Sequence, residues 1–220
     1  MILKVDNIYK SFLQAESGPL EILKGISFEM NQGETLAISG QSGSGKTTLL
    51  SLLAGLDSPD SGQIILDHED LNQLNEDRLA RFRAAEIGII FQQFHLMPHL
   101  TAEENISLPL EILKSEHIEQ RTNEALKQVG LENRRNHLPG RLSGGECQRV
   151  AIARALVMKP SILLADELTG NLDNRTGSQV ADLLFDLVHS INMTLIMVSH
   201  NLQLAARCKR QLRLVDGKLQ

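Results

Sequence analysis

The sequence predicts an α/β protein in which helices flank a largely parallel sheet, and three features of the 220-residue chain indicate this. Short apolar segments of strand length alternate with longer segments whose apolar residues repeat at helical spacing. The glycine- and serine-rich residues 40–47 stand between one such strand and one such helix. The composition, 42% hydrophobic and 22% charged, is typical of a globular protein. We expect one domain over residues 1–220.

The N-terminal part of the chain is typical of antiparallel β structure. Residues 3–5 form an extended segment, a loop containing Gly18-Pro19 follows, and residues 25–30 form a second segment. A turn at 31–34 leads to the strand before the glycine-rich loop, and residues 63–66 form a further strand. We expect these segments to make an antiparallel β region.

The rest of the chain alternates strands and helices, which favours a parallel sheet. Buried-strand patterns occur at residues 35–39, 87–91, 161–165 and 194–198. Helical patterns occur at 48–54, 105–113, 118–129, 144–158 and around 180–188. The mostly helical residues 101–159 are interpreted as an insertion between two strands of one core, and residues 212–219 as a hairpin with an Asp-Gly turn.

Residues 40–47 fit the phosphate-loop pattern G-x-x-x-x-G-K-[ST]. Glycines let backbone N–H groups turn towards phosphate oxygens, and the start of the next helix adds partial positive charge. An ordinary Gly/Ser turn is the alternative, but it explains neither the lysine nor the position between strand and helix. We predict nucleotide binding by Gly40, Gln41, Ser42, Gly43, Ser44, Gly45, Lys46, Thr47 and Thr48, with the Thr47 hydroxyl also a ligand of Mg²⁺.

An apolar strand at residues 162–165 ends in the carboxylates Asp166 and Glu167. In a phosphate-loop protein, an acidic residue at such a strand end stands beside Mg²⁺. We therefore predict that Asp166 is the metal partner and that Glu167 accepts a proton from the attacking water. Without the phosphate loop, the same pair would be interpreted as a solvated strand edge.

The helix at 144–158 begins with Ser143, Gly144, Gly145 and Glu146. A serine and two glycines at a helix start offer a hydroxyl and uncovered N–H groups, which is a second anion site. The alternative is a plain capping box between Ser143 and Glu146. The local residues do not decide between the two.

The chain resembles an ATPase subunit of ABC transporters over essentially its whole length. The features in the family's order are the phosphate loop, Gln92 after a strand, Leu142-Ser143-Gly144-Gly145-Glu146, Asp166-Glu167, Asn171-Leu172-Asp173 and His200. The resemblance implies a P-loop NTPase with a RecA-like core and an antiparallel β subdomain over about 1–92 and 160–220, and a helical subdomain over about 93–159. It also implies ATP and Mg²⁺ as cofactors and a head-to-tail homodimer on ATP binding.

The same resemblance implies roles for single residues. Phe12 stands where the family places an aromatic that stacks on adenine, with Tyr9 as a nearby alternative. Gln92 matches the glutamine that touches Mg²⁺ and the attacking water, and His200 matches the histidine at the γ-phosphate. Further matches are Asp173 at the dimer interface, and Ser143, Gly145 and Glu146 at the ATP of the partner subunit.

The segments at 91–98, 169–173 and 202–207 resemble the LolD, MacB and YbbA-like group of ABC ATPases, and residues 202–208 are nearest to the YbbA-like type. The resemblance implies an FtsX-type transmembrane permease as partner. The cluster Phe94, Leu96, Met97 and Pro98 is either a contact for that partner or part of the core. Leu168 and Cys147 depart from the family pattern, yet neither removes a catalytic group.

Charge and leader patterns limit the function further. The formal net charge of −5, without a basic block, argues against nucleic acid as a partner. Neither a signal peptide nor an apolar stretch of about 18 residues is visible, so we expect a peripheral protein at the cytoplasmic face of the inner membrane. The expected activity is ATP hydrolysis that drives the permease in export, lipoprotein release or envelope maintenance. An ATP-dependent switch that controls an envelope enzyme without moving cargo is the alternative.

Overall fold

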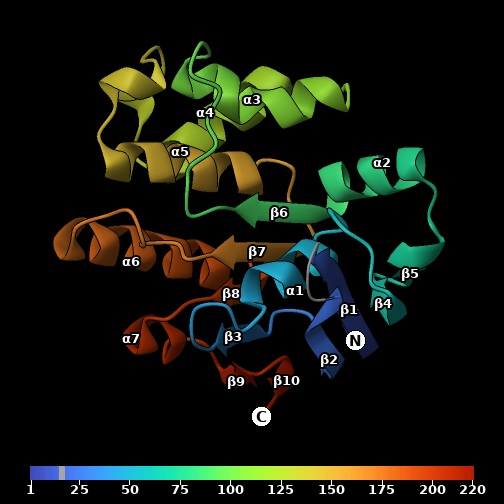
Figure 1. Ribbon diagram of the computed structural model, residues 1–220. Coiled ribbons are helices and arrows are strands. Elements are labelled where there is room, and N and C mark those ends of the chain that lie inside the picture. The colour runs from blue at the N-terminus through green and yellow to red at the C-terminus, as the bar shows by residue number, and fades with distance from the viewer. Residues whose placement is uncertain (15–17) are drawn as a thin grey trace. The chain divides into compact units, whose positions relative to one another are not determined.

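The computed structural model describes residues 1–14 and 18–220 (Figure 1). The chain forms two compact units. The first unit comprises Met1–Arg83 and Thr194–Gln220, and the second comprises Ala84–Met193. None of the helices within the described residues is long and apolar enough to cross a membrane. The predicted α/β class, with antiparallel and parallel sheets, is confirmed.

The first unit contains an antiparallel sheet in which the strand order is β2-β1-β4-β5. The strands are β1 (Leu3–Gln14), β2 (Gly18–Met30), β4 (Ser61–Leu66) and β5 (Glu69–Asp70). The prediction of a loop at Gly18-Pro19 was wrong, because β2 begins at Gly18 and Pro19 pairs with Leu13. Since β2 is the outermost strand in this order, Pro19 can join it without leaving a neighbour short of a hydrogen bond.

The same unit contains strands in the order β10-β9-β3-β8. They are β3 (Thr35–Ser39), β8 (Thr194–Val198), β9 (Arg210–Val215) and β10 (Lys218–Leu219). β3 pairs in parallel with both β8 and β9, and its residues Leu36–Ile38 are completely buried. The hairpin between β9 and β10 is confirmed, with Asp216 and Gly217 both at positive φ as an Asp-Gly turn requires.

The helices of this part are α1 (Lys46–Leu53), α7 (Leu202–Ala205) and the short turn η1 (Leu71–Gln73). Helix α2 (Glu76–Glu86) carries the chain from the first unit into the second. The apolar periodicity of the sequence did not predict α2, because this helix has no buried residue. Two signals in the sequence indicate the start of this helix. One is Asn75, whose side chain accepts a hydrogen bond from the Arg78 amide, and the other is the acidic first turn.

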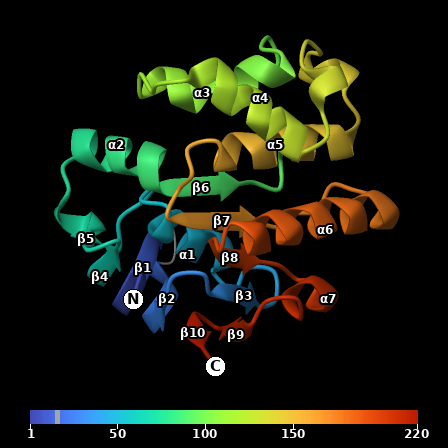
Figure 2. The same ribbon diagram turned by 180° about the vertical axis from the view of Figure 1, so that it is seen from behind.

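The second unit pairs β6 (Ile87–Ile90) in parallel with β7 (Ile162–Asp166). Its helices are α3 (Ala102–Ile112), α4 (Ile118–Gln128), α5 (Gly144–Leu156) and α6 (Asn174–Ser190), with short turns η2 (Glu132–Arg134) and η3 (Pro139–Arg141). Both views show α3, α4 and α5 grouped together (Figure 2). The stated limits of the helical subdomain, about 93–159, remain a prediction.

Candidate nucleotide-binding site

The phosphate loop connects β3, which ends at Ser39, to α1, which begins at Lys46. The Ser44 amide donates to the Gln41 carbonyl over 3.2 Å and so closes the loop. Gly45 is the N-cap of α1 at φ 100°, and it offers no side chain to cap the helix. The first N–H groups of α1 are thus oriented as an anion site requires.

Two glycines of the loop are fixed by their neighbours. A Cβ on Gly40 would lie 2.4 Å from the carbonyl oxygen of Leu214, and one on Gly45 would lie 2.9 Å from Cδ2 of Leu23. The positive φ of Gly45 also excludes most side chains. The loop therefore packs directly against β2 and β9, which hold its backbone in place.

Lys46 is 8% exposed, and its ammonium group lies against the loop. Nζ donates to the carbonyl oxygen of Gly40 over 3.1 Å and to that of Gln41 over 2.9 Å. The Ser44 hydroxyl lies 2.7 Å from the position of a Cβ on Gly40 and is buried without a hydrogen-bond partner among the described residues. A lysine cation and an unsatisfied hydroxyl in one loop fit a ligand with several acceptor oxygens, such as a triphosphate.

His200 follows β8, and Phe12 lies near the end of β1. The Ser199 amide donates to Ile38 of β3 over 3.3 Å, so His200 leaves the parallel sheet at the same edge as the phosphate loop. Phe12 is 45% exposed, and the Tyr9 ring lies against Gly25. Tyr9 is 39% exposed, so exposure does not separate the two aromatic candidates.

Gln92, Asp166 and Glu167 lie at one edge of the second unit. Ile90 of β6 is opposite Ala165 of β7 in the parallel register, so the residues that follow both strands emerge together. The Asn171 side chain donates to the Gln92 carbonyl over 2.8 Å. Glu167 is at φ 47°, a left-handed conformation that is unusual for this residue type and is found more often at functional sites.

The two departures from the family pattern are both buried. Leu168 is 2% exposed, and its carbonyl accepts a 3.0 Å hydrogen bond from Nε2 of the Gln148 side chain. The Cys147 thiol donates to the Pro139 carbonyl over 3.6 Å, and burial raises the pKa of this thiol. A raised pKa reduces the reactive thiolate form, which argues against redox sensitivity at Cys147.

The start of α5 contains a capping box, one of the two alternatives between which the sequence did not decide. Ser143 Oγ accepts from the Glu146 amide over 3.2 Å, and Glu146 accepts from the Ser143 amide over 2.8 Å. Arg134, which the sequence did not indicate, donates to the same carboxylate over 2.9 Å. The Arg134 bond is the main cause that lowers the pKa of Glu146 to about 2, and the Ser143 amide adds to it. The carboxylate is therefore ionised at neutral pH.

The glycines after Ser143 pack against the start of α6. A Cβ on Gly145 would lie 2.5 Å from the Thr176 methyl carbon, and one on Gly144 would lie 3.2 Å from Leu172. Asp173 caps α6 by accepting from the amides of Arg175 and Thr176. The capping box is confirmed, and an anion role for Ser143, Gly145 and Glu146 remains a prediction.

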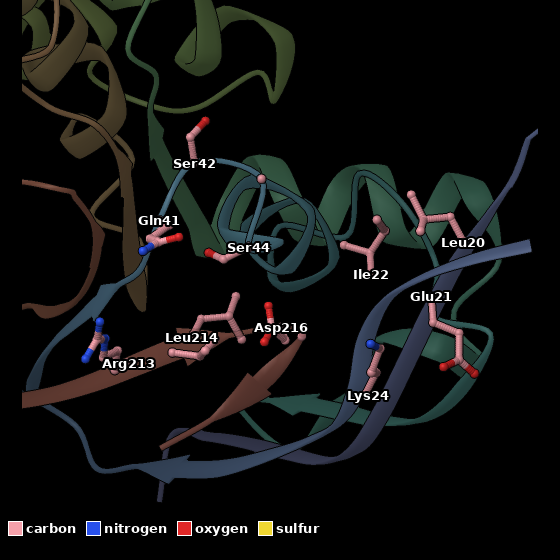
Figure 3. A pocket seen from close by; sticks show the side chains of 13 residues that line it. Leu20, Glu21, Ile22, Lys24, Gln41, Ser42, Ser44, Arg213, Leu214 and Asp216 are labelled. Atoms are coloured by element: carbon pink, nitrogen blue, oxygen red, sulfur yellow. The ribbon is translucent and has the colours of Figure 1, made fainter.

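The structure thus assembles the predicted residues in two sets. The first unit holds Phe12, Gly40–Thr48 and His200, and the second holds Gln92, Ser143, Gly145, Glu146, Asp166 and Glu167. A cavity of about 580 Å³ beside the phosphate loop was not predicted (Figure 3). Its lining includes Ile22 and Lys24 of β2 and Arg213 of β9, residues that no motif marks.

The donors proposed for Mg²⁺ suit that ion, which prefers oxygen ligands. Thr47 supplies a hydroxyl, Asp166 a carboxylate and Gln92 an amide oxygen. Within the described residues, no group of three or more His, Cys, Asp or Glu side chains could hold a metal ion.

A parallel sheet edge with a glycine-rich loop, a buried lysine and a helix N-terminus defines a P-loop nucleotide-binding protein. Residues 23–170 match the ABC transporter family. The chain belongs to this family, as an ATP-binding subunit.

Three similar proteins support this assignment. The uncharacterized ABC transporter ATP-binding protein YbbA of Escherichia coli strain K12 is 50% identical over 100% of this chain and 96% of its own. The ATP-binding cassette MJ0796, solved as a post-hydrolysis dimer bound to ADP and Pi, is 39% identical, with a TM-score of 0.90 over 100% of this chain and 97% of its own. The cbiO1 protein of Clostridium perfringens, part of the transporter complex cbiONQ, is 30% identical, with a TM-score of 0.87 over 100% of this chain and 86% of its own.

Proposed function

We propose that this chain binds and hydrolyses Mg-ATP to drive a membrane permease. The observation that carries the proposal is the phosphate loop, which contains the Lys46 ammonium and a buried Ser44 hydroxyl that has no hydrogen-bond partner among the described residues. This arrangement offers both a positive charge and a hydrogen-bond donor to a triphosphate. Phe12 stacks on the adenine in this proposal, and the remaining residues of Gly40–Thr48 hold the phosphates.

In the proposed reaction, Mg²⁺ and the predicted catalytic residues act on one nucleotide. Thr47, Asp166 and Gln92 hold Mg²⁺, which neutralises charge on the phosphates when bound. Glu167 takes the proton of the attacking water, and Gln92 and His200 orient the water and the γ-phosphate. The attack transfers the γ-phosphoryl group to water and leaves ADP and phosphate.

A second copy of the chain completes the site. We propose a head-to-tail homodimer on ATP binding, in which Ser143 and Gly145 face the γ-phosphate bound by the partner subunit, with Glu146 beside them. Support comes from the dimeric state reported for MJ0796. The start of α5 also suits an anion, because the first N–H groups of a helix carry partial positive charge.

The proposed partner is an FtsX-type permease at the cytoplasmic face of the inner membrane, in export, lipoprotein release or envelope maintenance. Its support is the resemblance to the LolD, MacB and YbbA-like group, together with the place of cbiO1 in a transporter complex. In the cluster after Gln92, Met97 is 42% exposed and Pro98 is exposed too, so both are available to a partner. Co-purification of the chain with its membrane subunit tests this partner directly.

Glu167→Gln tests the assigned base. The amide keeps the shape of the side chain but cannot accept a proton, so steady-state hydrolysis should fall at least about a hundredfold while ATP still binds. Release of phosphate and equilibrium binding of ATP are the two measurements. Glu116→Gln, at an exposed position outside the proposed site, is the matched control. Turnover of the Glu167 variant at the wild-type rate would contradict the assignment.

A further inference from the structure

The ring of Phe12 is held by a lysine that no motif marks. The Lys10 ammonium lies 5.2 Å from the centroid of the ring, within the range where a cation is attracted to an aromatic face. The Lys10 side chain is 11% exposed, whereas Phe12 is 45% exposed. One side of the ring is therefore occupied by the protein, and a large part of it is left open to a ligand.

Lys10 is itself fixed by the segment that follows α1. Its ammonium donates to the Asp57 carboxylate over 2.8 Å and to the Ser58 carbonyl over 2.7 Å. Two acceptors on one ammonium restrict the rotation of a side chain that is flexible elsewhere. The position of the charge over the ring is thus set by residues 57 and 58.

The next residue of β1 makes a second connection to the same segment. The Ser11 amide and hydroxyl both donate to the Asp60 carboxylate, over 2.7 Å and 2.6 Å. The Asp60 amide in turn donates to the Tyr9 carbonyl over 2.9 Å. We call Lys10, Ser11, Asp57 and Asp60 the clasp.

The clasp links the two parts of the proposed nucleotide site. Residues 57–60 come shortly after α1, whose first residue is Lys46 of the phosphate loop. Lys10 and Ser11 directly precede Phe12. The clasp therefore connects the part of β1 next to Phe12 with the segment that follows α1, the helix that begins at the phosphate loop.

We propose that Lys10 is a positioning residue for nucleotide binding. It holds the Phe12 ring at a fixed distance from the phosphate loop. At that distance one nucleotide can stack its base on the ring and place its phosphates in the loop. This inference rests on the proposed function, in which Phe12 stacks on adenine. A ligand with phosphates but no base does not use the ring, so Lys10 matters for ATP and not for tripolyphosphate.

The test compares the equilibrium dissociation constants of ATP and of inorganic tripolyphosphate, each with Mg²⁺, by titration calorimetry on the full chain. Lys10→Met should weaken ATP binding about three- to tenfold, the usual range for losing a cation over a ring. Tripolyphosphate binding should change by less than about twofold. Lys10→Arg, which keeps a cation over the ring, should restore ATP binding.

Lys4→Met is the matched control, because Lys4 lies on the same strand and pairs with Asp6 rather than with the clasp. It removes the same charge and should leave both constants unchanged. The double variant Lys10→Met/Phe12→Ala should bind ATP no more weakly than Phe12→Ala alone, since Lys10 acts through the ring.

Three results would overturn the inference: an equal loss for tripolyphosphate, a full additional loss in the double variant, or normal ATP binding by Phe12→Ala. Each of them leaves ATP binding and hydrolysis by the wild-type chain intact, and only the third also removes the adenine-stacking role proposed for Phe12. A wild-type chain that binds neither ligand contradicts the proposed function and the inference together.

Discussion

At the residue scale, the Glu146 carboxylate makes a pH-dependent contribution to the stability of the fold. Its pKa in the folded protein is about 2, below the ordinary value of 4.5. A carboxylate whose pKa is lower in the folded than in the unfolded protein stabilises the fold at pH values above its unfolded-state pKa. This stabilisation is lost as the pH falls from about 4.5 towards about 2. The free energy of unfolding of wild type minus that of Glu146→Gln should therefore shrink across this window.

Urea unfolding at several pH values between about 3 and 7 measures this difference. Arg134→Gln removes the largest cause of the shift, so it should reduce the pH dependence while leaving Glu146 in place. A difference between wild type and Glu146→Gln that stays constant over the whole range would contradict the assigned pair.

Gly40 is a residue whose replacement should affect both stability and binding. An added Cβ would lie 2.4 Å from the Leu214 carbonyl oxygen, so the backbone must move. Gly40→Ala should lower the free energy of unfolding by about 1–3 kcal/mol and weaken ATP binding. Gly140→Ala, where a Cβ meets nothing within 4 Å, should do neither. Equal stability and equal ATP binding for the two variants would refute the close packing of the loop.

Sequence reasoning at this scale finds residues that belong to local motifs. Lys46 and Glu146 were found because neighbouring residues fix their roles. Arg134 was not, because its partner is twelve residues away and only the fold brings the two side chains together. Lys10 and Asp57 were missed for the same physical reason, since they are separated by 47 positions.

At the scale of elements, the capping of α3 explains why this helix starts before its predicted limit. The Thr101 hydroxyl accepts from the Glu104 amide, and the Glu104 carboxylate accepts from the Thr101 amide. Asn105, the predicted first residue, is buried and donates instead to the carbonyls of Met97, Leu100 and Thr101. The helix therefore begins at Ala102.

Thr101→Ala should lower the free energy of unfolding by about 1 kcal/mol, the usual effect of removing a helix N-cap. Thr101→Ser keeps the oxygen acceptor and should stay close to the wild type. Chemical denaturation of the three proteins measures the effect. A Thr101→Ala protein as stable as the serine variant would contradict the capping role.

Elements with a buried face were predictable, and those without one were not. The buried strands β3 and β8 and the helices α4 and α5 follow from apolar spacing, because packing selects that spacing. None of the residues of helix α2 is fully buried, so its sequence carries only a weak periodic signal. The strand at Pro19 was missed because proline is usually read as a strand breaker, although an outermost strand tolerates it.

At the scale of the whole molecule, the motifs of one chain are divided between two compact units. The phosphate loop and His200 belong to the first, while Glu167 and the Ser143 tip belong to the second. The sequence predicted the elements that carry these motifs, among them β3 before the phosphate loop, α1 after it and α5 after Ser143. The action of these motifs on one nucleotide remains a proposal, because the sequence shows neither the ligand nor the proposed second copy.

The mass of Glu167→Gln in solution, measured with and without Mg-ATP by light scattering during gel filtration, tests the central claim most directly. Blocked hydrolysis should hold the nucleotide between two chains. The measured mass should therefore be that of a dimer with Mg-ATP and that of a monomer without it. Ser143→Arg in the same background places a bulky cation at the proposed contact and should prevent the doubling. A monomer at saturating ATP, with nucleotide bound, would contradict the account.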